Sequence, residues 1–189
     1  SKREQTRERI LRAAASAIRK HGYEGVGVAD VMKNAGLTHG GFYAHFGSRD
    51  SLLAAAADRA GAESIESLGR AIAAAKPGEE LMALVDSYLS DRHLAAAEQG
   101  LGCTIAAAGT EVPRQETGVR RAASRRIKDM IGLVERQSPD WGKSGAHEKA
   151  MAVTATLVGA LVLARAVDDA QLGKNIRKAA RELILVAAG

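Results

Sequence analysis

The stretch GVADVMKNAGLTHGGFYAHF, which occupies residues 27 to 46, decides the fold of the N-terminal part of the chain. Its apolar residues recur with the spacing of one face of an α-helix: Val28, Val31, Met32 and Ala35. Gly36 follows, and glycine readily adopts the left-handed conformation that ends a helix. The pattern therefore predicts a short helix with one buried face, followed by a tight turn.

A second short helix is expected directly after this turn. Thr38 offers a hydroxyl that can cap it, and Phe42 and Phe46 share its inner side. The opposite side carries small, aromatic and hydrogen-bonding residues: His39, Gly40, Gly41, Tyr43 and Ala44. Two short helices joined by a tight turn form a helix-turn-helix, whose second helix can lie in the major groove of DNA.

The segment THGGFYAHF, followed by GSRDSLL, resembles the recognition helix and the next helix of the TetR family of transcriptional regulators. The resemblance covers roughly residues 4 to 64 without a gap. It rests on the spacing of six residues: Gly36, Gly40, Tyr43, His45, Phe46 and Leu52. Family members often have a threonine at the position of Gly27, where its hydroxyl would bind backbone or phosphate. Gly27 can still cap the helix, at a cost of a few tenths of a kcal/mol, but it lacks that hydroxyl.

Nine residues are expected to contact DNA: Lys33, Thr38, His39, Gly40, Gly41, Tyr43, Ala44, His45 and Arg49. Thr38 and His39 lie at the helix start, where they can meet a phosphate or a base edge. Tyr43 would donate its hydroxyl to a phosphate. The reading face has no Arg, Asn or Gln for a bidentate base contact, so it predicts modest base specificity.

The remaining members of this set have less specific roles. Lys33 and Arg49 are candidate phosphate clamps on the flanking helices. His45 either contacts the DNA backbone or makes a structural hydrogen bond. Gly40 and Gly41 each cost roughly 1 kcal/mol in helix propensity. Their bare backbone can approach DNA closely, and the alternative is a frayed first turn.

The composition predicts an all-α protein. The chain has 189 residues, which correspond to one or two domains, and only three prolines. We expect a DNA-binding domain with three helices over residues 1–64 and a helical effector-binding and dimerisation domain over 65–189. Cys103 is the sole cysteine, so it cannot form an intramolecular disulfide. No basic-then-apolar leader is evident, and a cytoplasmic location is expected.

The positive charge is concentrated beside the predicted helix-turn-helix. The net charge is +5, and residues 1 to 20 alone hold seven basic and two acidic residues. A basic arm at this place suits the neutralisation of DNA phosphates. The alternative is a solvated helix face, which is the usual role of charged runs.

The rest of the chain predicts further helices, at about 79–94, 103–109, 115–137, 147–168 and 173–188. Residues 150–164 carry no charge but are too few to span a bilayer before Arg165. By resemblance, the last two helices form a four-helix bundle with their copies in a second subunit. Two recognition helices held about 34 to 36 Å apart would then read a palindromic operator.

The sequence signals for the effector-binding site are less specific than those for DNA binding. The five histidines are scattered, and no metal set or nucleophilic triad is present in the sequence, so neither an enzyme nor a cofactor is expected. A non-covalent, largely apolar effector is expected, with candidate lining residues Tyr88, Met130, Trp141 and Met151. Each of these is also a plain core candidate. The Gly102-Cys103 start of a helix resembles a subset of the family, so Cys103 is either a redox or electrophile sensor or a small buried residue.

The sequence therefore predicts a dimeric DNA-binding repressor that a small-molecule effector releases from its operator. Activation in place of repression stays open. So does an architectural protein that binds DNA without effector control. An enzyme that reuses the three-helix bundle would need a cluster of titratable groups, which the sequence does not show.

Overall fold

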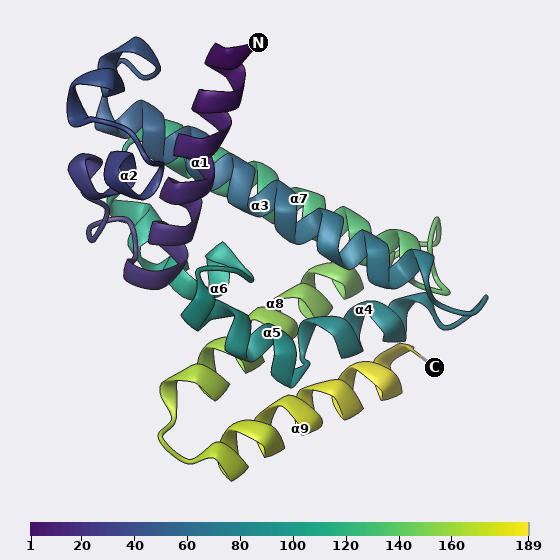
Figure 1. The fold of residues 1–189 in the computed structure, drawn as a ribbon. Helices are drawn as coiled ribbons and strands as arrows, with labels where there is room; N and C mark the ends of the chain where they lie inside the picture. The colour runs from purple at the N-terminus through teal and green to yellow at the C-terminus, as the bar shows by residue number, and fades with distance from the viewer. Residues whose placement is uncertain (189) are drawn as a thin grey trace. The chain divides into compact units, whose positions relative to one another are not determined.

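The computed structural model describes residues 1 to 188, which form an all-helical structure without a strand (Figure 1). This confirms the predicted all-α class. In chain order the α-helices (α) and 3-10 helices (η) are α1 Lys2–His21, α2 Val28–Asn34, η1 His39–Ala44, α3 Arg49–Ala73, α4 Glu80–Tyr88, α5 Asp91–Ala96, η2 Ala97–Gln99, α6 Thr104–Ala108, η3 Gly109–Arg114, α7 Thr117–Gln137, α8 Ala146–Ala166 and α9 Ala170–Ala188.

The chain divides into two compact units. Unit 1 comprises Ser1–Glu63 and Ala96–Arg126, and unit 2 comprises Ser64–Ala95 and the chain from Ile127 onward. The first break lies beside the boundary expected after residue 64. Residues 96–126, however, belong to unit 1 and not to a continuous C-terminal unit. The assignment of DNA binding to 1–64 and effector binding to 65–189 stays a prediction.

The core of unit 1 is built around α1. Ile10, Ala14 and Ile18 are fully buried on one face of this helix. They pack with the apolar faces of α2, η1 and α3, and with three residues from the second segment of unit 1: Ala108, Val119 and Ala122. The N-terminal helices thus share one core with residues far along the chain. Burial of apolar side chains contributes about 1.5 to 3 kcal/mol for each large residue.

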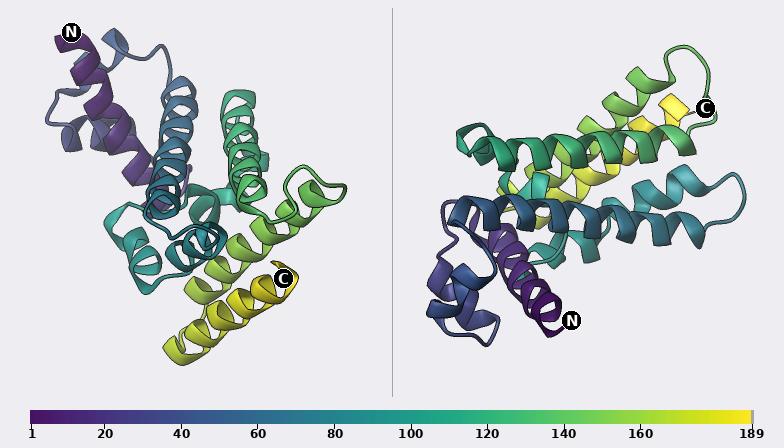
Figure 2. Two further views of the ribbon diagram at one scale, coloured as in Figure 1. Left: turned by 90° about the vertical axis from the view of Figure 1, so that its right-hand side faces the viewer. Right: turned by 90° about the horizontal axis from the view of Figure 1, so that it is seen from above.

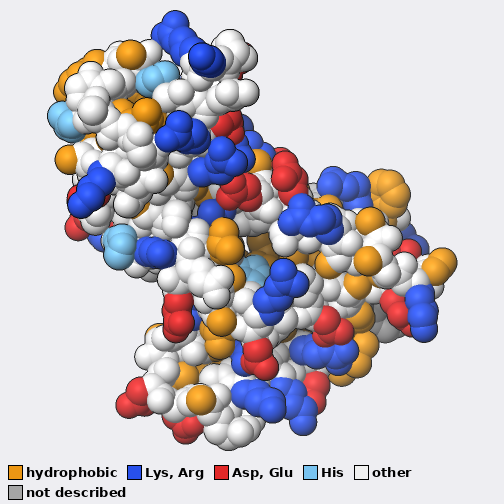
Figure 3. All heavy atoms as spheres, in the orientation of Figure 1, with side chains coloured by type: hydrophobic (Ala, Val, Ile, Leu, Met, Phe, Trp, Pro, Cys, Tyr) orange, Lys and Arg blue, Asp and Glu red, His pale blue; other side chains and the backbone are white. Residues whose placement is uncertain are grey.

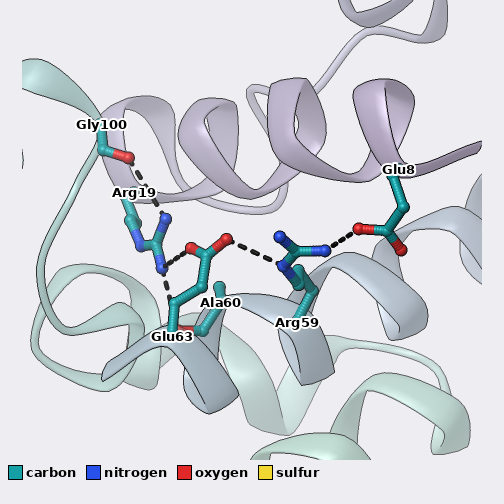
Figure 4. A network of polar contacts seen from close by, with 6 residues as sticks. All are labelled: Glu8, Arg19, Arg59, Ala60, Glu63 and Gly100. Carbon is teal, nitrogen blue, oxygen red and sulfur yellow. Dashed lines mark hydrogen bonds and ion pairs between the residues drawn. The ribbon is translucent and has the colours of Figure 1, made fainter. Parts of the chain in front are cut away.

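A chain of polar contacts joins α1 to α3 and to the Gly100 turn (Figure 4). The Arg19 side chain is 4% exposed, and its Nη2 donates to the Ala60 carbonyl at 2.9 Å and to Glu63 at 2.8 Å. Its Nη1 donates to the Gly100 carbonyl at 3.3 Å. Glu63 also pairs with Arg59 at 2.9 Å, and Arg59 pairs with Glu8. The buried guanidinium is therefore compensated by one carboxylate and two carbonyls.

The Gly100 turn packs closely on α1. Gly100 has a φ of 72°, in the left-handed region, and a Cβ at this position would overlap the Ser16 hydroxyl. Glu111 lies over the turn after α1 and accepts from the Glu24 backbone N–H at 3.2 Å. Residues 96–126 are thus fitted to α1 by backbone contact as well as by the shared core.

In unit 2, α8 and α9 lie side by side as an antiparallel pair (Figure 2). The predicted helix 79–94 is interrupted, because α4 ends at Tyr88 and the Ser90 hydroxyl accepts from the His93 N–H at the start of α5. Arg177 of α9 holds this break, with bonds of 2.6 Å to the Leu89 carbonyl and to Asp91.

Helix α8 is longer than the uncharged run suggested. It extends over 21 residues, and by length and composition alone it could cross a bilayer. The argument that this segment is too short to span is therefore wrong. The core helix of a soluble protein has the same composition, and α8 buries Val153, Leu157 and Leu161 on its packed face.

Candidate DNA-binding site

The helix-turn-helix is formed by α2 and η1. Gly27 precedes α2 as its N-cap, and its φ of −91° and ψ of 133° suit a capping residue. Gly36 has a φ of 68° and turns the chain, and the Leu37 N–H donates to the Met32 carbonyl at 2.9 Å. This is the glycine turn that the sequence predicts, and it brings η1 against α2.

The recognition element is the short helix expected after the turn, and it is a 3-10 helix. It covers His39–Ala44, and the Gly41 N–H donates to the Thr38 carbonyl at 3.1 Å. Two glycines lower helix propensity, which explains why this segment forms a tight, short turn of helix. Thr38 occupies the capping position, but its side chain makes no capping hydrogen bond.

One face of η1 is buried and the other is open. Phe42 and Phe46 are 2% and 5% exposed and stack at 6.0 Å. Tyr43 is 73% exposed and meets the Phe42 ring edge-on at 5.1 Å. Thr38, His39, Gly40 and Ala44 are also exposed, and Gly41 is half-buried. The open face therefore has the hydroxyl, imidazole and bare backbone that could meet DNA.

Three arginines of the basic arm position η1 and the turn. Arg3 donates to the Ala44 carbonyl at 3.0 Å, and Arg9 donates to the Ala35 carbonyl. The Arg7 guanidinium lies 4.9 Å from the centre of the Phe46 ring. The sequence indicated phosphate neutralisation or a solvated helix face for these cations, and nothing in its pattern revealed their carbonyl and aromatic partners.

The other predicted DNA contacts differ in their surroundings. Arg49 donates from Nε to the Val26 carbonyl at 3.0 Å and from Nη2 to the Tyr23 carbonyl at 2.7 Å. This geometry favours a positioning role for Arg49 at the entry to α2. His45 is half-buried, and its buried Nδ1 has no hydrogen-bond partner among residues 1–188. Lys33 is exposed at the end of α2.

Substitution of Gly40 separates its two predicted roles. A Cβ built on Gly40 meets nothing within 4 Å, so Gly40→Ala should fold and gain up to about 1 kcal/mol of stability from helix propensity. If the bare backbone approaches DNA, the same methyl group should weaken DNA binding by about tenfold. Urea unfolding and fluorescence anisotropy with a selected duplex would measure both effects.

Gly69→Ala is the matched control, because Gly69 lies in α3 and its Cβ also meets nothing within 4 Å. It should gain similar stability without a change in DNA affinity. Unaltered DNA binding by Gly40→Ala would support the frayed-turn interpretation of the glycines.

The candidate effector residues differ in how far their side chains are exposed. Tyr88 and Met130 are 1% and 7% exposed in unit 2, whereas Trp141 and Met151 are 62% and 40% exposed. Cys103 belongs to unit 1, where it is 4% exposed at the start of the five-residue helix α6. The surroundings of Cys103 match a small buried residue, which is the less reactive of its two predicted roles. Within residues 1–188, no cluster of three or more potential metal ligands occurs.

His93 is a buried titratable group that sequence reasoning missed. Its ring lies edge-on to Tyr88, with centroids 4.7 Å apart. Burial, and secondly the Arg165 cation, lower the pKa of His93 to about 4. The imidazole is therefore neutral at neutral pH.

This neutral histidine predicts a loss of stability in acid. Between about pH 6.5 and pH 4 the unfolded chain binds a proton at His93 that the folded chain does not, so stability falls as the pH falls through this window. Allowing for the partial exposure of the ring, we expect a loss of roughly 2 kcal/mol. Urea unfolding at pH 7 and 4.5 should show a smaller loss in His93→Gln than in the wild type. Equal losses of stability in the two proteins would show that His93 is not the group responsible.

Comparisons with known proteins agree with this geometry. Residues 10–56 match the family described as bacterial regulatory proteins, tetR family. An uncharacterized HTH-type transcriptional regulator of Mycobacterium tuberculosis strain H37Rv is 34% identical over 192 residues, which cover 95% of this chain and 94% of that protein.

Two solved structures share the fold. A TetR transcriptional regulator from Chloroflexus aurantiacus is 26% identical, with a TM-score of 0.76 over 97% of this chain and 96% of that chain. NemR of E. coli in its reduced form has a TM-score of 0.79 at 19% identity, over 95% of each chain. The glycine-turned helix pair, the family match and the relative of similar length show that this chain belongs to the TetR family of DNA-binding transcriptional regulators.

Proposed function

We propose that the protein is a homodimeric repressor that leaves a palindromic operator when a small molecule binds. The observation that carries the proposal is the pairing of two features: the open face of η1 and an uncovered apolar surface on α8 and α9. The first suits a DNA groove, and the second suits a copy of the chain.

Exposed apolar residues recur along both helices. On α9, Leu172, Leu183 and Val186 are 45%, 60% and 80% exposed, and they share one stripe at helical spacing. On α8, Met151, Val162 and Leu163 are 40%, 38% and 55% exposed on one face. Large exposed apolar patches are uncommon on monomers and mark association sites. We call this set of six residues the α8–α9 surface.

The α8–α9 surface supports a two-fold dimer with a four-helix interface. A two-fold interface joins the same surface on both subunits, and an antiparallel helix pair meets its copy as a four-helix bundle. Small residues such as Ala155 and Gly159 lie along α8 and permit close approach. The predicted effector residue Met151 lies on this surface, which favours a role in dimerisation.

The proposed effector contacts are the residues that the sequence predicted. Tyr88 and Met130 remain proposed effector contacts within unit 2, and Trp141 and Cys103 remain candidates with an exposed and a buried side chain respectively. The membership of a Gly-Cys subset, a cytoplasmic location and the absence of catalysis are further parts of the proposal. A screen of metabolites for release of the operator would separate an effector-controlled regulator from a DNA-binding protein without effector control.

Selection of bound fragments from random DNA tests the core of the proposal. We expect a palindrome whose half-sites are centred about 34 to 36 Å apart, or a multiple of one helical turn. Recovery of no enriched sequence, together with no binding in dilute salt, would overturn the proposal.

Tyr43→Phe tests the role of the exposed hydroxyl. Because the phenol edge is solvent-exposed and away from the core, the variant should fold normally. Loss of a phosphate contact should weaken the binding of all duplexes alike, by about 1 kcal/mol. Anisotropy titrations on the selected duplex and on single-base variants would measure this. A changed base preference at one position, with overall affinity intact, would show that Tyr43 reads a base.

A further inference from the structure

A basic groove runs between α1 and α2 in unit 1. It has a volume of about 950 Å³. Four cations line it, together with one carboxylate: Arg9, Arg12, Lys20, Lys33 and Asp30. Lys and Arg side chains are numerous on this part of the molecule, at the upper left of Figure 3. The groove therefore carries a formal excess of three positive charges.

Most of these cations lack a protein partner. Arg9 is held by the Ala35 carbonyl. For Arg12, Lys20 and Lys33, no other residue from 1 to 188 provides a hydrogen bond or an ion pair. Arg12 and Lys20 are eight residues apart on α1, which places them about 12 Å apart along the helix axis. Three uncompensated cations around one groove favour an anionic occupant with several charges.

Much of the groove lining consists of small residues. Ala13, Ser16 and Ala17 come from α1, and Ala35 and Gly36 come from the turn after α2. His21 also lines the groove, but no Phe, Tyr or Trp does, and Val31 is its largest aliphatic residue. Protein partners are usually anchored by large apolar or aromatic side chains in fitting pockets, which this lining does not offer. A sugar-phosphate backbone needs charge and hydrogen-bond donors in place of apolar pockets.

We infer that this groove binds phosphate groups of the DNA strand beside the half-site read by η1. In helix-turn-helix complexes the first helix crosses the DNA backbone while the second lies in the major groove. That first helix is α2, which forms one wall of the groove. Arg12 can bind a phosphate in a bidentate manner, and Lys20 and Lys33 act as point charges. The inference rests on the proposed function and adds Arg12 and Lys20 to its DNA contacts.

The test is the salt dependence of binding to a duplex selected from random DNA, extended by ten base pairs at each end. Each phosphate contact contributes about 0.9 to the slope of log affinity against log salt. In the full-length protein, Arg12→Ala/Lys20→Ala should lower the slope by roughly 1.8 per bound subunit and weaken binding at least about tenfold at 0.1 M salt. Both side chains are exposed, so the fold should not change.

Lys76→Ala/Lys128→Ala is the control with the same charge change. Both lysines are exposed and belong to unit 2. The control should keep the wild-type slope to within about 0.5. A second variant, Asn34→Lys, adds a cation to the groove and should raise the slope by about 0.9 per subunit.

The outcomes separate this inference from the proposed function. If the wild type binds no duplex, the proposed function fails and the groove inference fails with it. If the wild type binds the selected duplex but both groove variants keep its slope, only the groove inference fails. Calorimetric titration of the free protein with pyrophosphate distinguishes the source of phosphate. Pyrophosphate binding that is lost in Arg12→Ala/Lys20→Ala, with an unchanged DNA slope, would assign the groove to a free phosphate compound and overturn the DNA assignment.

Discussion

Leu183→Arg is expected to make the protein monomeric and to weaken operator binding by about 10²- to 10⁴-fold. Leu183 lies on the exposed stripe of α9, between Leu172 and Val186 and one turn from Val186. An arginine there would be buried without a partner in a two-fold interface, and it would face its own copy. The DNA effect follows because two linked half-site contacts bind far more tightly than one. Light scattering after gel filtration and anisotropy with the palindrome measure the two effects.

Gln171→Arg provides the control for this substitution. Gln171 is exposed on α9 but lies about a quarter-turn away from the apolar stripe. The control should remain dimeric and bind the operator as the wild type does. A dimeric Leu183→Arg protein with wild-type affinity would show that the subunits meet elsewhere.

Arg19→Met is expected to reduce the free energy of unfolding by about 3 kcal/mol. The substitution leaves the Gly100 carbonyl without its side-chain donor and leaves Glu63 with Arg59 alone. Burial raises the pKa of Glu63, but hydrogen bonds from Arg19 and Arg59 outweigh it and hold this pKa below its usual value. The ion-pair contribution is thus present above the unfolded pKa of Glu63 and is lost as the pH falls. The midpoint temperature of thermal unfolding should fall by roughly 6 to 12 °C.

Arg59→Met removes the neighbouring cation of the same network and serves as the comparison. The Arg59 side chain is 31% exposed, so its ion pairs are screened by water and contribute about 1 kcal/mol or less. Similar losses for Arg19→Met and Arg59→Met would contradict the view that the buried guanidinium holds α1, α3 and the Gly100 turn together. Urea unfolding at pH 7 gives both values.

The sequence alone determined the features that depend on neighbouring residues. The apolar spacing of Val28, Val31 and Met32 predicted α2, because helix periodicity places them on one face. Gly36 predicted the turn, since its φ of 68° suits a glycine. The inward Phe42 and outward Tyr43 followed from the same helical spacing. These signals sufficed for the helix-turn-helix and for the family resemblance.

Only the tertiary structure decided which groups meet across the chain. Residues 96–126 pack with α1 because Gly100 fits against Ser16 and because Arg19 reaches the Gly100 carbonyl. A guanidinium looks the same in sequence whether it faces solvent or a distant carbonyl. Its role depends on long-range contacts, which periodicity does not report. For this reason a basic run, for which the sequence left open a phosphate-binding arm or a solvated helix face, contains both structural arginines and the unpaired cations of the α1–α2 groove.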